Sequence, residues 1–439
     1  MNPFGLAFTL VTAALLMAAP RNWAALPLLL GAACMPNGQE IEVGPLHFSI
    51  VRLLILAGFI RVMSKGEQMT GGLTTMDRLM ICWAGWLVAT TVLHDGKVLI
   101  TRMGEMYNAV GVYFLFRILM RDLDDIWQIC RILCVLMVPL SAAMLSEKLT
   151  GKNFYSIFGF VSAETVFRHG HFRARGPFAH AITAGTVGAM CFAPALCLWK
   201  RDRKLAILGV LGAFGVVFAS GSSGPIMSVL TISGALGLWL FRTKVRLFRW
   251  AGILALVVLD LMMKDPIYYL VAKIDLTGGS TGWHRAALIG SAIAHLNEWW
   301  FAGTDVTRHW MPTGNWSNDN HTDITNFYLL MGVWGGLVLM AILIAFLTVG
   351  FKTVGRFLRA HPDLPMDQQF LIWTLGAILF GHSVTFFSIS YFDQSAVFLY
   401  MLLAILSVVA AIEPVTVPET VPFDSGFSPE NEPSLYSNS

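Results

Sequence analysis

Long apolar stretches alternate with short polar loops along most of the chain, and this pattern predicts a bundle of membrane-spanning helices. A span needs roughly 20 apolar residues, and backbone amides in lipid must bond to one another, which favours helices. The predicted fold is all-α, a polytopic membrane bundle of about 12 helices (12–13), because the first two segments are short enough to form one broken span. We expect the spans at residues 4–19, 23–36, 47–63, 78–94, 98–120, 126–146, 178–199, 205–220, 225–241, 247–263, 326–350, 370–388 and 391–412.

Lysine and arginine gather in every second loop, and this alternation sets the expected orientation. Short cytoplasmic loops carry an excess of these residues. We assign to the cytoplasm the loops near 61–78, 117–121, 200–204, 242–249 and 352–359. Two long loops, 147–177 and 264–325, then face outward, and the larger one is expected to contain short helices. Residues 1–412 form a single predicted transmembrane domain, and the acidic, Pro/Ser-rich residues 413–439 are expected to be a disordered cytoplasmic tail.

Composition supports the membrane class and removes other classes. Hydrophobic residues make up 56% and charged residues 13% of the chain, whereas soluble proteins carry about 25% charged residues. The net charge of +3 comes without a basic tail, so we expect no nucleic-acid partner. No Lys or Arg precedes the first apolar run, which predicts a retained span rather than a cleaved signal peptide. All six cysteines lie in or beside apolar segments, so no disulfide is expected.

The first long outward loop carries cations that topology does not explain. Arg173 and Arg175 stand two residues apart at the mouth of a predicted span. In extended backbone such residues point to the same side. The planar fork of arginine binds phosphate oxygens through two hydrogen bonds. The pair could therefore clamp one diphosphate, and the alternative is a pair of interfacial arginines that bind lipid headgroups.

The second long outward loop adds a third cation and a candidate base. Arg285 follows a glycine-rich stretch and opens residues 283–296, whose apolar spacing predicts a helix along the membrane surface. Further on, His321 stands between Asp319 and Asp323. A histidine accepts a proton near neutral pH. No second histidine lies at ligand spacing from it, so no metal is expected there. A solvated polar loop is the alternative.

One predicted span contains a charged pair. Arg102 and Glu105 lie at helical spacing within residues 98–120. Ionisable groups inside a membrane are costly and are usually paired. We expect an intrahelical ion pair, with a wall of the substrate cavity as the alternative.

Taken in order, the polar segments form a series of short motifs. Residues 175–180 read Arg-Gly-Pro-Phe-Ala-His, 220–224 form a Ser/Gly turn, 282–285 read Gly-Trp-His-Arg and 299–303 read Trp-Trp-Phe-Ala-Gly. His321 follows, with Gly332 and Gly335 in the next span; a second alignment centres instead on the Asn-Phe-Tyr-Leu that begins at Asn326. Over residues 40–410 this series resembles the O-antigen ligase and O-antigen polymerase superfamily of bacterial inner-membrane glycosyltransferases.

The resemblance implies an inverting glycosyl transfer on the periplasmic face of the bacterial inner membrane. The donor would be a glycan on a polyprenyl diphosphate and the acceptor a glycan or lipid-linked sugar, with no cofactor and no metal. Fixed arginines stabilise the charge that develops on a leaving diphosphate. The diphosphate-binding residues are then Arg173, Arg175 and Arg285. The catalytic residues are His321 and Arg285, and the supporting residues are Asp319, Asp323 and Asn326.

A polymerase of O-antigen or exopolysaccharide repeats is the preferred function, and three alternatives stay open. The first is a ligase that transfers the glycan to lipid A-core. It differs from the polymerase only in the acceptor, which no residue identifies. A transporter of lipid-linked glycans would show internal repeats and polar groups near the membrane midplane. The chain shows no repeat and collects its polar chemistry on one face, which favours an enzyme. A non-catalytic assembly protein would tolerate loss of the arginines.

Overall fold

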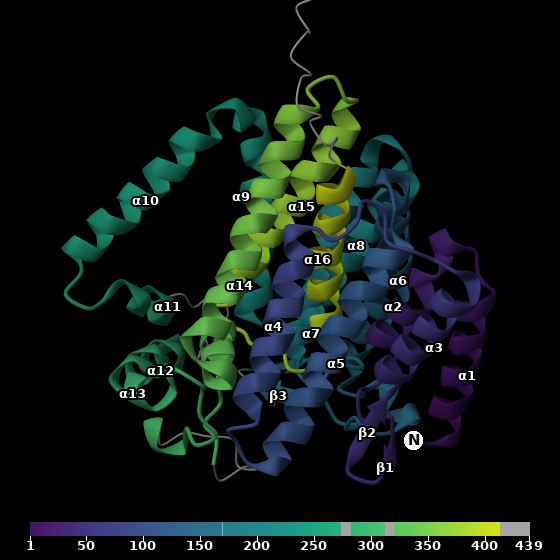
Figure 1. Cartoon of the computed structure of the whole chain (residues 1–439), viewed down its shortest axis with the longest axis horizontal. Coiled ribbons are helices and arrows are strands. Elements are labelled where there is room, and N and C mark those ends of the chain that lie inside the picture. The colour runs from purple at the N-terminus through teal and green to yellow at the C-terminus, as the bar shows by residue number, and fades with distance from the viewer. Residues whose placement is uncertain (169, 274–281, 312–319, 413–439) are drawn as a thin grey trace, which may run out of the picture.

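The computed structural model describes residues 1–168, 170–273, 282–311 and 320–412, and helices dominate it (Figure 1). The all-α prediction is confirmed. Strands are confined, in the described residues, to two short antiparallel pairs, β1 (Glu40–Val43) with β2 (Leu46–Ser49) and β3 (Val166–Arg168) with β4 (His171–Arg173). The predicted tail lies outside the described residues. The helices are α1 (Pro3–Ala18), α2 (Ala25–Cys34), α3 (Ile50–Lys65), α4 (Thr75–Thr91), α5 (Gly96–Leu119), α6 (Leu123–Thr150), α7 (Ala181–Cys197), α8 (Arg203–Ser220), α9 (Ser223–Gly237), α10 (Val245–Met262), α11 (Leu270–Lys273), α12 (Gly282–Ala294), α13 (Leu296–Trp299), α14 (Phe327–Ala360), α15 (Met366–Thr385) and α16 (Ala396–Ile412).

Four helical stretches of the described chain are long and apolar enough to cross a membrane: Leu123–Thr150, Ala181–Lys200, Arg203–Ser220 and Phe327–Ala360. The predicted count of about twelve is therefore not met. Two apolar helices, α1 and α16, are shorter, with 16 and 17 residues. Helix α5 has 24 residues but carries several charges, and 3₁₀ turns shorten others, as η4 (Leu238–Lys244) does after α9. Some residues of the apolar runs therefore lie in helix ends and 3₁₀ turns, so the helices are shorter than the runs.

The core lies where α6, α7, α8, α14, α15 and α16 meet. Most side chains of α7 and α16 are buried, so these two helices lie at the centre of the bundle. Small residues let helices approach closely: a Cβ on Gly188 of α7 would lie 2.8 Å from a methyl carbon of Val216 on α8. In contrast, α10 has no buried residue, and Figure 1 shows α10 diverging from the bundle.

One end of the bundle collects the irregular segments. The pair β1–β2, strand β3 and helices α12 and α13 lie together at the lower end in Figure 1, while the connection between α14 and α15 lies at the other. The helix predicted over residues 283–296 is confirmed as α12, Gly282–Ala294. The two long loops of the sequence thus converge at one end, where they enclose the cavity described next.

Candidate functional site

The three predicted diphosphate-binding arginines line one cavity of about 330 Å³. Strands β3–β4 and the chain after them supply Arg168, Arg173 and Arg175. Helix α12 supplies Arg285 from the opposite side, and the turn between α8 and α9 and residues 388–392 complete the walls. Asp323 also lines the cavity. Segments more than 100 residues apart in sequence therefore place four guanidinium groups and one carboxylate around the same space.

A buried carboxylate fixes the chain that carries Arg173 and Arg175. The two oxygens of Glu147, on α6, accept hydrogen bonds from the backbone N–H of Arg175 at 3.1 Å and of Gly176 at 2.8 Å. The hydroxyl of Thr165 donates to Glu147 at 3.0 Å. Gly176 has φ +56°, a conformation that favours glycine. Because Glu147 holds this backbone, the positions from which the two arginine side chains extend into the cavity are fixed.

Two of the arginines have buried N–H groups without an acceptor in the described part of the chain. These are the Nε of Arg173 and the Nε of Arg285, although Arg173 also donates from Nη2 to the hydroxyl of Ser222. A buried donor left unsatisfied costs about 1–3 kcal/mol. An anion in the cavity would supply the missing acceptors.

The electrostatics of the cavity also favour an anion. Burial lowers the pKa of the Arg173 guanidinium, and the nearby cation Arg168 lowers it further. Burial likewise lowers the pKa of Arg285; Asp323 opposes this shift and Arg173 adds to it. The cations thus repel one another in a partly desolvated space, and a single carboxylate compensates them only in part. A phosphate group would convert this repulsion into attraction.

Another part of the cavity wall is held by a residue to which the sequence alone gave no role. Asp393 precedes α16, and its Oδ2 accepts hydrogen bonds from the backbone N–H of Ala179 at 3.1 Å and from the hydroxyl of Thr183 at 2.8 Å. The neighbouring Gln394 donates to the carbonyl of Pro177 at 2.9 Å. The connection between α15 and α16 is thereby fastened to the segment that follows Arg175. An ionisable residue in an apolar stretch was the only signal for it.

The residue predicted as the base, His321, and the residues predicted to support it do not lie in one site. Asp323 lines the cavity, whereas His321 and Asn326 are not among the lining residues. The Oδ1 of Asn326 accepts from the N–H of Leu329 at 3.0 Å and caps α14. Asp319 lies outside the described residues. Of the predicted polar group, Asp323 is therefore the member that meets the arginines.

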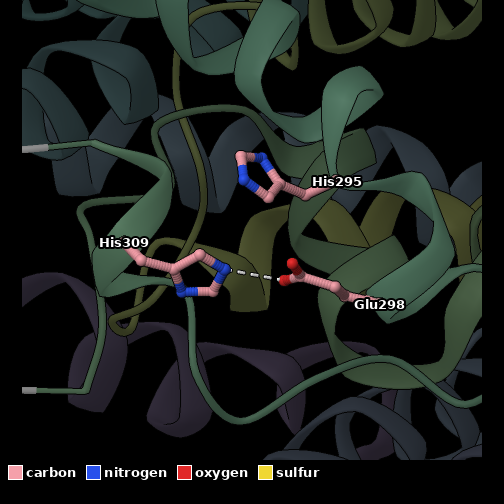
Figure 2. A group of neighbouring side chains, drawn as sticks. All are labelled: His295, Glu298 and His309. Atoms are coloured by element: carbon pink, nitrogen blue, oxygen red, sulfur yellow. Dashed lines mark hydrogen bonds and ion pairs between the residues drawn. The ribbon is translucent and has the colours of Figure 1, made fainter.

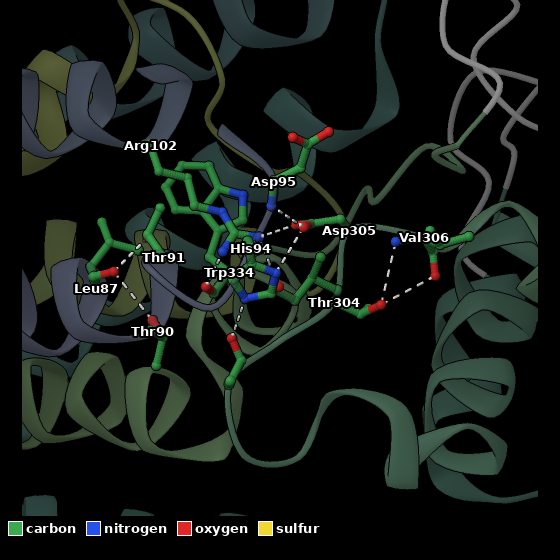
Figure 3. A network of polar contacts seen from close by, with 12 residues as sticks. Leu87, Thr90, Thr91, His94, Asp95, Arg102, Thr304, Asp305, Val306 and Trp334 are labelled. Atoms are coloured by element: carbon green, nitrogen blue, oxygen red, sulfur yellow. Dashed lines mark hydrogen bonds and ion pairs between the residues drawn. The ribbon is translucent and has the colours of Figure 1, made fainter. Parts of the chain in front are cut away.

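His321 interacts electrostatically instead with Asp305 and Arg102, two members of a second polar cluster that Figure 3 shows. Burial lowers the pKa of His321, while Asp305 raises it and Arg102 lowers it. In that cluster, Arg102 donates to Asp305 at 3.0 Å, and Nδ1 of His94 lies 2.8 Å from the other Asp305 oxygen. The expected Arg102–Glu105 pair is wrong, because Glu105 lies 3.7 Å from Arg52. Tertiary packing brings α5 against the loop after α13 and supplies Arg102 with a closer carboxylate.

The second cluster is built on a break in α14. Gly335 and Gly336 have non-helical backbone angles, with φ +71° at Gly336. The break frees carbonyl groups that other elements satisfy: Arg102 donates to the carbonyl of Trp334 at 2.8 Å, and the Trp86 indole donates to that of Gly335 at 2.7 Å. The loop after α13 joins in, since the N–H of Thr304 donates to the Val333 carbonyl at 3.0 Å.

This loop in turn holds the segment that carries Asp323. The hydroxyl of Thr307 accepts from the N–H of Thr322 at 3.0 Å, and the N–H of Thr307 donates to the carbonyl of Asn320 at 2.9 Å. Thr307 and Thr322 are both buried. A set of hydrogen bonds therefore links the loop of Asp305 to the segment that carries Asp323 at the cavity.

No protein-family model matches the chain, and no curated protein matches it at a significant level.

Proposed function

We propose that this protein is a multi-pass membrane glycosyltransferase that moves a glycan from a polyprenyl diphosphate to an acceptor sugar. We place it in the bacterial inner membrane with the cavity on the periplasmic side. The observation that carries the proposal is the convergence of Arg173, Arg175 and Arg285 on one cavity, where two of them keep buried donors without acceptors. Three guanidinium forks around a small space fit a diphosphate better than a single headgroup phosphate.

The volume and the position of the cavity suit such a donor. About 330 Å³ is at the lower end of the range of small-molecule sites, which is enough for a diphosphate and the sugar bonded to it. The long polyprenyl chain would stay outside the cavity, in lipid. Four helices of membrane-spanning length support a bundle that lipid surrounds, and in our proposal the cavity lies at one end of it.

The reaction that the residues support is an inverting displacement. The acceptor hydroxyl attacks the anomeric carbon as the bond from that carbon to the diphosphate oxygen breaks. The electron pair leaves with the diphosphate, whose growing charge Arg173, Arg175 and Arg285 stabilise. The hydroxyl proton passes to a carboxylate, and Asp323 is the carboxylate that lines the cavity. We therefore assign the base to Asp323 rather than to His321.

A reconstituted assay tests the reaction and the base together. The full chain in lipid nanodiscs receives an undecaprenyl-diphosphate-linked repeat, and released undecaprenyl diphosphate and extended glycan are measured. Asp323→Asn should lower the rate by about 10²–10⁴-fold, as expected for loss of a general base, while His321→Ala should stay within about tenfold of wild type. A normal rate for Asp323→Asn would remove it as the base. Absence of any transfer by the wild type would overturn the function.

Glycan profiles in a deletion strain separate the finer alternatives. If single repeats accumulate on their final acceptor, the protein is a polymerase. If long chains remain on the polyprenyl carrier, the protein is a ligase that transfers to lipid A-core. An unchanged profile, together with movement of labelled lipid-linked glycan across the membrane, would indicate a transporter instead.

A further inference from the structure

Outside the arginine cavity, a second group of side chains gathers where α12 ends (Figure 2). It consists of His295, Glu298 on α13, and His309 in η6 (Arg308–Trp310). The nitrogen and oxygen atoms that these three residues can offer to an ion lie within 4.8 Å of one another. Nε2 of His309 lies 2.9 Å from Oε2 of Glu298. Two imidazoles and one carboxylate are a donor set that zinc commonly takes.

Neighbouring groups orient two of the three donors. Nδ1 of His295 lies 2.8 Å from the carbonyl oxygen of Ser291. A carbonyl can only accept, so Nδ1 carries the proton and Nε2 presents its lone pair. The indole of Trp310 donates to Oε2 of Glu298 at 3.0 Å and its ring stacks on His295 with centroids 5.9 Å apart. Hydrogen bonds of this kind from a second set of residues are usual around metal ligands.

The group is also accessible to an ion. His309 and Glu298 are exposed, so an ion can reach them from solvent.

We propose that His295, Glu298 and His309 bind one divalent transition-metal ion, with Zn²⁺ preferred, and that water fills its remaining position. Ligand atoms around tetrahedral zinc stand roughly 3.4 Å apart, given metal–ligand distances of about 2.0–2.1 Å. The ligand atoms of the three residues are already within about 1.5 Å of that spacing. Small side-chain rotations would bring them to it. Imidazole nitrogen binds transition metals better than it binds Mg²⁺ or Ca²⁺, so the two histidines favour a transition metal.

The ion would be structural and would not take part in the proposed transfer. His295 follows Arg285 by ten residues, which is about 15 Å along a helix, so an ion there cannot touch a diphosphate held by Arg285. Instead it would tie α13 to η6, on either side of the loop that carries Asp305. That loop holds the segment of Asp323 through Thr307. The proposal thus stands whether or not the transfer reaction is correct.

The test measures Zn²⁺ bound by the purified full chain after chelator treatment. The chain carries an affinity tag without histidines, and zinc is titrated against a chromophoric competitor. Wild type should bind one Zn²⁺ per chain, and His309→Ala should bind at least about 100-fold more weakly. His309 is exposed, so this variant should fold normally. His361→Ala is the matched control, because His361 stacks on Phe357 at the far end of α14 and should leave zinc affinity unchanged.

A second variant and a second readout separate the remaining outcomes. Another acid-and-histidine group, Glu40, Glu42 and His47, lies on the β1–β2 pair. If His47→Ala abolishes binding and His309→Ala does not, the proposal fails. Co²⁺ in place of zinc should give visible absorption of a four-coordinate site in wild type and lose it in Glu298→Gln. Equal zinc binding by wild type and His309→Ala, or no binding by wild type, would also overturn the proposal.

Discussion

Replacing Arg285 by Gln would test whether the crowded cations of the cavity exist to bind an anion. The change removes one positive charge and the guanidinium fork while keeping a polar side chain of similar length. Arg285 lines the cavity, has a buried Nε without an acceptor in the described chain, and repels Arg173. The substitution should therefore weaken donor binding and turnover but leave the stability of the fold equal or higher.

The size of the first effect comes from the bonds that a phosphate would make. A hydrogen bond to a charged group contributes about 1.5–3 kcal/mol, and each 1.36 kcal/mol changes a rate by a factor of ten. Arg285→Gln should therefore lower the rate of donor turnover by about 10- to 150-fold. The second effect is on stability: the substitution removes an unsatisfied buried donor and a like-charge neighbour, so thermal stability should stay equal or rise.

The assay combines donor turnover in nanodiscs with thermal unfolding of the same preparations. Arg203→Gln is the matched control. Arg203 begins α8 and stacks on Trp199 at 4.9 Å, about 25 Å along α8 from the cavity end, so this variant should keep both properties. A normal rate for Arg285→Gln would refute the anion-binding role. A lost rate together with a matching loss of stability would show that Arg285 serves the fold.

Other predictions concern stability. Gly336→Ala should cost about 1–3 kcal/mol, because Gly336 has φ +71° and a Cβ there would clash with the backbone oxygen of Phe301. Gly355→Ala on the same helix, where the nearest atom to a Cβ is 3.4 Å away, should be neutral or stabilising in the same thermal melts. Asp305→Asn should cost about 1.5–3 kcal/mol in denaturant unfolding, because Arg102 would lose its charged partner; a cost under 0.5 kcal/mol would contradict the role of the cluster. For pH, burial lowers the pKa of His321 from its ordinary 6.5, so below about pH 6.5 the unfolded chain takes up a proton that the folded chain does not, and stability falls. His321→Gln should flatten that slope, and an unchanged slope would contradict the burial argument.

The sequence singles out the arginines of the cavity because cations are rare in so apolar a chain. Arg173, Arg175 and Arg285 stand out, and the extended spacing of the first two predicts a common direction. The structure brings all three to one cavity. Their meeting depends on contacts between distant segments, which the pattern of apolar runs does not specify.

The remaining polar contacts are long-range and leave little local trace. Asp305 lies 203 residues from Arg102, and Asp393 lies 210 from Thr183. No periodicity connects such pairs. In the metal candidate, His295 lies in the turn before α13, Glu298 lies in α13, and His309 joins them through a loop, so no sequence spacing marks the three residues as a group.

The number of spans was overestimated for a different physical reason. Hydropathy counts every apolar residue of a run, whereas a helix ends where its backbone turns. Helix α9 ends at Gly237 and a 3₁₀ stretch follows, so the apolar run of that segment is divided between two elements. Caps and turns are local backbone events that average hydrophobicity does not detect.

The break at Gly335–Gly336 leads us to expect that the geometry of the cavity depends little on membrane thickness. Of the 34 residues of α14, the 24 from 337 to 360 follow the break and extend for about 36 Å, against a hydrocarbon core of about 30 Å. That arm alone can meet a change in bilayer thickness by tilting. The arm before the break is held by Trp86 and Arg102 and can keep its position. Turnover in bilayers of different acyl length should therefore vary little, and Gly336→Ala, which stiffens the junction, should make it vary more.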